Sequence, residues 1–128
     1  MANKILFVHD GPLFSFRDKN LYGNQVNNKL IERYCYLGKP VKFIMRKQNL
    51  DSKSIKDYSI IDHPQFEFDS IPNFLSLFAL HKKYEAKQII KKEVKSHDII
   101  ICRLPSAAGV IAFKEAKKQN KPILVEGV

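Results

Sequence analysis

Residues suited to acid–base chemistry follow directly after the first short apolar run of the sequence. The run Lys4–Val8 leads into His9, Asp10 and Gly11. A histidine beside a carboxylate can act as a general base with its orienting partner, although a histidine at a strand end can equally make a structural hydrogen bond. Glycine lets the backbone approach a ligand closely. We therefore take His9, Asp10 and Gly11 as candidate substrate-binding residues.

Two later apolar runs also end in polar residues that can bind anions or sugars. Arg103 follows such a run directly, and a guanidinium there can clamp a phosphate or carboxylate with two hydrogen bonds, or form a surface ion pair. Ser106 is expected at a helix start, where capping and contact with an anion are compatible. Glu126, near the end of the last run, can hydrogen-bond sugar hydroxyls or be a plain strand-end carboxylate. All three are candidate substrate-binding residues, and no catalytic residue is assigned.

Strands and helices must alternate to place these residues together. Runs that are apolar throughout are typical of strands buried on both faces, as in parallel sheets. The segments between them show one apolar face at helical spacing. This alternation predicts a Rossmann-like three-layer α/β/α fold with a mainly parallel sheet, in a single domain of residues 1–128. The expected strands are Lys4–Val8, Pro40–Met45, Tyr58–Asp62, Phe66–Phe68, Asp98–Arg103 and Lys121–Val128, and the expected helices span 24–38, 72–95 and 105–120.

A long loop is expected between the first strand and the first helix. In an open sheet of this kind, ligands bind beyond the carboxyl ends of the strands. The segment His9–Gly23 would then lie over the ligand crevice, and the helix starting near Asn24 would point its N-terminus there, which favours an anion. The alternative is a surface loop whose aromatic side chains pack on the sheet edge.

Composition narrows the classes of partner. The chain has 128 residues with a formal net charge of +9, which favours anionic partners such as nucleic acid, anionic lipid or phosphorylated substrates. A dinucleotide-binding fingerprint and a P-loop motif are both absent, and the four histidines lack metal-ligand spacing, so no cofactor and no metal are expected. Short apolar runs and the separated cysteines Cys35 and Cys102 indicate a cytoplasmic protein with reduced thiols.

The helix predicted over Pro72–Lys95 is strongly basic. Its second half carries six lysines between Lys82 and Lys95. A helix with basic and apolar faces can lie on an anionic membrane surface. The alternative is an ordinary helix that packs on the core and exposes a solvated lysine face. Its expected apolar set is Phe74, Leu77, Phe78, Tyr84, Ile89, Ile90 and Val94.

The order of these elements resembles the N-terminal domain of a GT-B glycosyltransferase of the retaining family 4 type, which is common in bacterial capsule and surface polysaccharide synthesis. The matching stretches are KILFVHDGPLF, the helix start at GNQVNNKLIERY, and the late unit DIIICRLPSAAGVIAFKEAKKQNKPILVEGV. The resemblance implies that the chain is the acceptor-side half of such an enzyme, truncated before a C-terminal domain that binds most of the nucleotide-sugar donor. Alone, this half would not transfer sugar.

The resemblance also gives roles to the expected loop. Phe14, Phe16 and Tyr22 would offer apolar faces to sugar rings or to a lipid-linked acceptor, and Arg17 would offer a charge for its phosphate. The protein would then lie in the cytoplasm and contact the inner face of the membrane peripherally. An alternative function from another class is a non-catalytic flavodoxin-like α/β domain that binds nucleic acid or another anionic partner through its basic surface.

Overall fold

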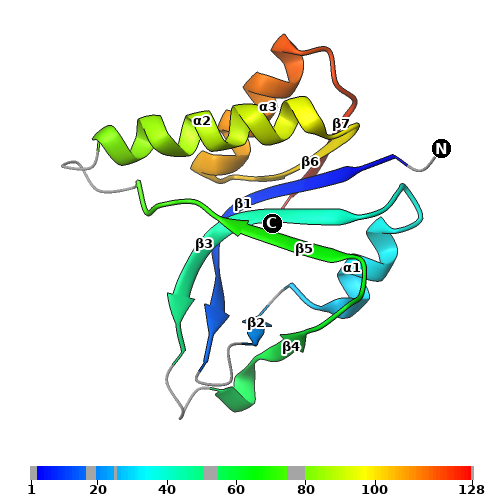
Figure 1. Ribbon diagram of the computed structural model, residues 1–128, viewed down its shortest axis with the longest axis vertical. Helices are drawn as coiled ribbons and strands as arrows, with labels where there is room; N and C mark the ends of the chain where they lie inside the picture. Colours follow the sequence, from blue (N-terminus) through cyan, green and yellow to red (C-terminus); the bar gives the residue numbers. More distant parts are fainter. Residues whose placement is uncertain (1–2, 17–19, 25, 51–54, 75–79, 128) are drawn as a thin grey trace.

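The computed structural model describes residues 3–16, 20–24, 26–50, 55–74 and 80–127. Strands and helices alternate along most of the chain, and Figure 1 shows them around one bent sheet. In order, the elements are β1 (Ile5–Ser15), β2 (Leu21–Gly23), α1 (Asn28–Tyr34), β3 (Val41–Asn49), the 3-10 turn η1 (Ile55–Asp57), β4 (Ser59–Ile61), β5 (Phe66–Ser70), α2 (Leu80–Ser96), β6 (Ile99–Leu104), α3 (Ala107–Lys118) and β7 (Ile123–Gly127).

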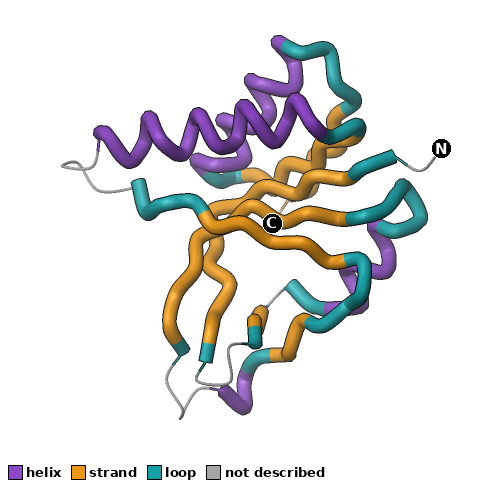
Figure 2. Tube along the Cα trace, viewed as in Figure 1, coloured by secondary structure: helices purple, strands orange, loops and turns teal. Residues whose placement is uncertain are grey.

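Strand β1 is the centre of the sheet. It pairs in parallel with β3 on one side and, through its first half from Ile5 to Val8, with β6 on the other. Strand β5 adds to β3 and β7 adds to β6, both in parallel. The far end of β1 pairs instead with β2 in antiparallel fashion, and β2 pairs likewise with β4. Figure 2 shows β1 and β3 bending together from the first part of the sheet into the second.

The long loop predicted after the first strand is largely a continuation of that strand. Strand β1 runs on to Ser15, with an irregular register against β3 between Val8 and Pro12. Leu13 lies beyond the irregularity and is fully buried. A bulge bends a strand and locally increases its twist, which agrees with the bend in Figure 1. The prediction of a loop over the crevice was therefore wrong for residues 9–15 and 21–23.

The predicted Rossmann-like three-layer α/β/α fold is also wrong. The sheet is mixed, because β2 and β4 run antiparallel to their neighbours. The helices cover the two faces of the sheet unequally, since α2 and α3 lie side by side on one face and the seven-residue α1 lies on the other (Figure 1). The described chain between β3 and β5 forms η1 and β4 rather than a crossover helix. The second helical layer is therefore incomplete.

Two apolar clusters fill the two sides of the sheet. Leu6 and Val8 of β1 pack with α2 and α3 in one cluster, whereas Ile5 and Phe7 pack with α1 in the other. Successive side chains of a strand point to opposite faces, so a run that is apolar at every position is buried on both. This is the pattern that the sequence indicated for the first strand. Of the cysteines, Cys102 is buried, Cys35 is half-buried, and both are free thiols.

Helix α2 is more exposed on one side than predicted, and the predicted start of the helix is not helical. Pro72 and Phe74 precede it in non-helical backbone. Tyr84, expected in its apolar face, is 66% exposed, so that assignment was wrong; Leu77 and Phe78 lie outside the described residues. Its buried residues are Ala86, Ile90 and Val94. The ammonium group of Lys42 on β3 lies 3.0 Å from the Glu93 carboxylate and 2.7 Å from that of Asp69, which ties α2 to the sheet.

Candidate functional site

Three polar side chains meet on the α1 side of the sheet, near the ends of β6 and β7 and at the irregularity that follows Val8 in β1. Phe7 and Ile101 belong to the cluster beneath α1. His9 lies two positions after Phe7 on β1, and Arg103 lies two positions after Ile101 on β6. Because side chains alternate along strands, His9 and Arg103 are on the same face. Arg103 and Glu126 are register partners on β6 and β7. The structure therefore brings together His9, Arg103 and Glu126, which the sequence predicted from their places after apolar runs.

The guanidinium of Arg103 is held between an aromatic ring and a carboxylate. Its central carbon lies 5.3 Å from the centroid of the Phe7 ring, a cation–π contact. One terminal nitrogen lies 3.5 Å from a carboxylate oxygen of Glu126. The Nε atom is buried and has no hydrogen-bond partner within the described part of the chain. A planar donor group that is fixed in place and keeps a spare N–H is suited to an anionic or hydroxyl ligand.

Tyr34 joins this network from helix α1. Its hydroxyl donates a hydrogen bond of 2.6 Å to the Glu126 carboxylate. Burial and the Glu126 carboxylate raise the pKa of the Tyr34 phenol, so the group remains protonated and acts as a donor. In the sequence Tyr34 fits the apolar face of a helix. A tyrosine ring suits such a face and carries its hydroxyl to a polar partner, and nothing in the spacing of the residues identifies that partner.

Replacing Tyr34 by phenylalanine is expected to lower the free energy of unfolding by about 1–2 kcal/mol, because a hydrogen bond to a charged acceptor is lost at a largely buried position. Urea unfolding measures this loss. Tyr36 is 87% exposed, so Tyr36→Phe is the matched control and should change stability by less than about 0.5 kcal/mol. Equal effects of the two substitutions would contradict a role for the Tyr34–Glu126 hydrogen bond.

His9 lies beside Arg103 in a partly buried setting. Burial of the ring, followed by the positive charge of Arg103, lowers the pKa of His9 from its ordinary value of 6.5, so the imidazole is neutral at pH 7. Its Nδ1 atom is buried and makes no hydrogen bond to any described residue. A Cβ atom added at Gly11 would lie 2.9 Å from the His9 ring. Glycine at position 11 therefore leaves room for the imidazole.

A cavity of about 170 Å³ opens beside these groups. It is smaller than a typical ligand pocket of about 300–1,000 Å³, so it fits one charged or polar group rather than a whole oligosaccharide. Four of the predicted site residues line it, together with apolar and amide side chains from β1, β3 and the segment before α1. The lining residues are His9, Gly11, Pro12, Leu13, Phe14, Asn24, Val26, Met45 and Arg103.

Asp10 points away from His9 and binds the start of α3. Its two carboxylate oxygens accept hydrogen bonds from the backbone N–H groups of Ala107, at 2.6 Å, and Ala108, at 2.8 Å. A carboxylate at a helix N-terminus satisfies free donors and complements the helix dipole. Asp10 is thus placed as a cap for α3 and not as the orienting partner of His9.

Ser106 is the N-cap residue of α3. Its hydroxyl accepts the N–H of Gly109 and donates to the carbonyl of Arg103, both at 2.9 Å. Helix α1 is capped similarly, because the side chain of Asn27 accepts the N–H of Leu30. The helix start was predicted near Asn24. The polar groups that the sequence assigned to anion binding at helix starts are therefore occupied by caps in the protein.

The aromatic residues predicted to contact a sugar are placed differently from one another. The ring of Phe14 lines it from one side and packs on Tyr58, with 4.7 Å between the ring centroids. Phe16 lines a different hollow, formed with Ser15, Asn49 and Leu50. Arg17 lies outside the described residues. Of the aromatic residues given sugar-binding roles by the resemblance, Phe14 lines the cavity beside His9 and Arg103, Phe16 lines the other hollow, and Tyr22 is buried in β2.

A second cluster of potential ligand atoms lies at the C-terminal end of α1. The ligand atoms of Glu32, Cys35 and His63 lie within 4.8 Å of one another. Both ring nitrogens of His63 are already used, because Nε2 lies 2.5 Å from the Glu32 carboxylate and Nδ1 accepts the N–H of Gln65 at 3.1 Å. A metal at Nε2 would require a proton on Nδ1, facing that N–H. The hydrogen bonds explain this cluster without a metal.

A comparison with known proteins finds a relative in sequence. The chain is 35% identical over 127 residues to Protein CapJ of Staphylococcus aureus, and the match covers 98% of this chain and 32% of that protein. The chain thus spans about a third of the length of this relative. No protein-family model matches the sequence. Among the described residues, no helix is both long and apolar enough to cross a bilayer.

Two solved structures of the C-terminal domain of a hydrogenase from Pyrococcus furiosus are similar in overall arrangement. They cover 97% of this chain and 91% of their own, with sequence identities of 14% and 12% and TM-scores of 0.44 and 0.46.

Proposed function

We propose that this chain is the acceptor-binding part of a bacterial glycosyltransferase in capsule or surface polysaccharide synthesis. The similarity to Protein CapJ supports the capsule part of the proposal, since the name of that protein suggests capsule synthesis. The transferase part is supported by the resemblance of the apolar runs and their polar ends to the family described above. It does not require a GT-B fold, which the mixed sheet does not support.

One observation carries the proposal, namely the cavity lined by His9 and Arg103, each of which has a buried polar atom that makes no hydrogen bond to a described residue. A neutral imidazole offers one donor and one acceptor, and the Arg103 Nε–H is a donor. A sugar hydroxyl can both donate and accept, and a phosphate can accept from the guanidinium. A saccharide carrying a phosphate presents both kinds of group. Under this proposal the nucleotide-sugar donor is bound mainly by another part of a longer enzyme, and this chain alone transfers no sugar.

The test is a titration of the chain with N-acetylglucosamine 1-phosphate, followed by the NMR shifts of backbone amides. We expect shifts at residues that line the cavity, and weaker binding of the unphosphorylated sugar. Arg103→Gln should weaken binding of the sugar phosphate by about tenfold or more, because a charge-assisted hydrogen bond is lost. The matched control is Arg33→Gln, since Arg33 is exposed on α1. Unchanged binding by Arg103→Gln, or shifts confined to surfaces away from the cavity, would refute the proposal.

A further inference from the structure

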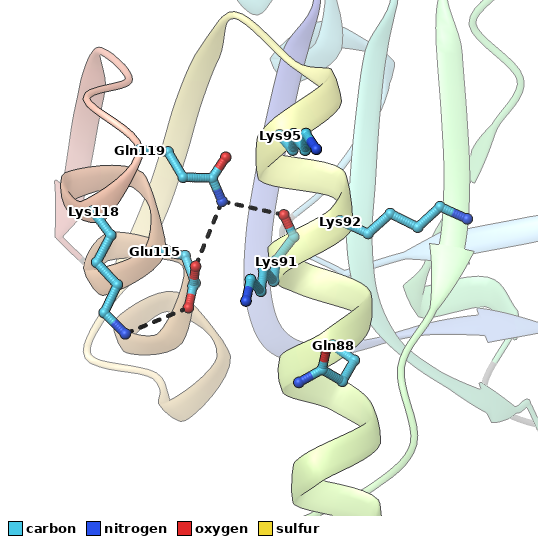
Figure 3. A pocket seen from close by; sticks show the side chains of 7 residues that line it. All are labelled: Gln88, Lys91, Lys92, Lys95, Glu115, Lys118 and Gln119. Atoms are coloured by element: carbon cyan, nitrogen blue, oxygen red, sulfur yellow. Dashed lines mark hydrogen bonds and ion pairs between the residues drawn. The ribbon is translucent and has the colours of Figure 1, made fainter.

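Helices α2 and α3 form a lysine-rich surface on the face of the sheet opposite to α1. The two helices run in the same direction, because the first half of α2 borders the start of α3 and its second half borders the end of α3. Two hollows follow the line between them. The larger, of about 600 Å³, is lined by Gln88, Lys91, Lys92, Lys95, Glu115, Lys118 and Gln119 (Figure 3).

The charge of the larger hollow is strongly positive. Four lysines line it against one carboxylate, that of Glu115. This carboxylate is already engaged, at 3.8 Å from the ammonium of Lys118 and 3.5 Å from the side-chain amide of Gln119. Glu93 on α2 turns away to Lys42 on the sheet. Figure 3 shows Lys91 on the side of α2 that faces α3, Lys92 pointing away from α3, and Lys118 along α3 with its ammonium beside Glu115.

The second hollow, of about 440 Å³, lies near the start of the two helices and is also positively charged. Lys83 and Lys87 come from α2 and Lys114 from α3, and no acidic residue is among the described residues that line it. The basic surface therefore extends along the whole length of the two helices. Such an array fits an extended anionic surface better than a single small anion.

Apolar side chains are exposed at one end of this basic surface. Leu80 is 78% exposed and Tyr84 is 66% exposed at the start of α2, and Val110 is 41% exposed on α3. On α2, Leu80 and Tyr84 are four positions apart and therefore share one face of the helix. On α3, Val110, Lys114 and Lys118 are also four positions apart and share one face of that helix. Since the helix starts are neighbours, the exposed apolar groups gather at one end and the lysines extend from them.

We infer that the α2–α3 surface docks on an anionic lipid bilayer. Lysines are attracted to anionic headgroups, and exposed leucine, tyrosine and valine side chains can enter the boundary between headgroups and acyl chains. Nucleic acid would use the positive charge but would leave Leu80 and Val110 without an apolar environment. The bilayer is therefore the partner that accounts for both features. This inference is independent of the proposed sugar site, which lies on the other face of the sheet.

The experiment is flotation of the chain with two kinds of vesicle, one of pure phosphatidylcholine and one that contains about 30% phosphatidylglycerol. We expect binding only to the anionic vesicles. The triple variant Lys91→Gln/Lys95→Gln/Lys118→Gln should bind them at least about tenfold less, because each lysine near the surface contributes separately. The matched control removes the same charge from exposed positions elsewhere, with Lys29→Gln/Lys39→Gln/Lys56→Gln, and should keep most of the binding.

A second variant tests the apolar contribution. Leu80→Ser/Tyr84→Ser keeps every charge and should also weaken binding to the anionic vesicles, by about tenfold, as two exposed apolar side chains no longer enter the bilayer. Circular dichroism confirms that each variant is folded. The inference would be overturned if neither vesicle bound the chain, or if both triple variants bound equally. It would also fail if a DNA duplex bound more tightly than the anionic vesicles and the Leu80→Ser/Tyr84→Ser variant bound the vesicles normally.

Discussion

Replacing Phe7 by alanine is expected to lower the free energy of unfolding by about 3–5 kcal/mol, the cost of removing a large ring from a packed core. Phe7 is fully buried at the centre of the sheet. Its ring centroid lies 4.5 Å from that of Phe43 and 5.6 Å from that of Tyr34. Because domains of this size are stable by about 5–15 kcal/mol in total, the variant should be close to unfolding. Urea unfolding at 25 °C measures the change.

The same substitution should also disturb the candidate site, since the Phe7 ring lies against the Arg103 guanidinium. Phe7→Leu keeps most of the buried volume but removes the ring. It should cost less stability than Phe7→Ala and still weaken binding of N-acetylglucosamine 1-phosphate. Tyr36→Ala is the control, because it removes an aromatic ring that is 87% exposed and should change stability little. A loss of less than about 1 kcal/mol for Phe7→Ala would show that Phe7 is not part of a packed core.

The strands with apolar residues at every position were predictable from the sequence. In β1, Ile5 to Val8 are fully buried because helices cover both faces there. The extension of β1 was not predictable, because Gly11 and Pro12 are residues that usually end a strand. They are tolerated at the irregular register between Val8 and Pro12. The short strands β2 and β4 pair mainly with each other and with the end of β1, so they depend on contacts that no local pattern reveals.

The site was partly predictable for a related reason. Carboxyl ends of parallel strands meet at one edge of a sheet, which brings Arg103 beside Glu126. Side chains at alternate positions of a strand point to opposite faces of the sheet, so residues two positions apart share a face. His9 lies on the same face as Phe7 and lines the cavity, whereas Asp10 lies on the same face as Val8 and binds the start of α3. The pair His9 and Asp10, adjacent in the sequence, is therefore divided between the two faces of the sheet.

This division also separates the two proposed surfaces. The cavity opens on the side of α1, and the lysine-rich surface is built by α2 and α3 on the other side. Variants of one surface should leave the other intact. Arg103→Gln should bind anionic vesicles normally, and the triple variant of Lys91, Lys95 and Lys118 should bind the sugar phosphate normally. Each proposal can therefore fail in its own binding test while the other proposal stands.

Replacing Asp10 by alanine is expected to lower the free energy of unfolding by about 2–4 kcal/mol. The carboxylate accepts the N–H groups of both Ala107 and Ala108. Without it two partly buried donors have no acceptor, and each unsatisfied donor costs about 1–3 kcal/mol. Asp10→Asn keeps one oxygen acceptor and should lose less. Urea unfolding measures stability, and hydrogen exchange should become faster at the two amides.

Two controls make the interpretation specific. Asp57 is exposed, so Asp57→Ala removes a carboxylate without removing a cap and should change stability by less than about 0.5 kcal/mol. Asp10→Asn should also bind N-acetylglucosamine 1-phosphate like the unaltered chain, because Asp10 faces α3 and not the cavity. If Asp10→Asn instead weakened this binding while hydrogen exchange at Ala107 and Ala108 stayed slow, Asp10 would act on His9, and its assignment as the cap of α3 would be wrong.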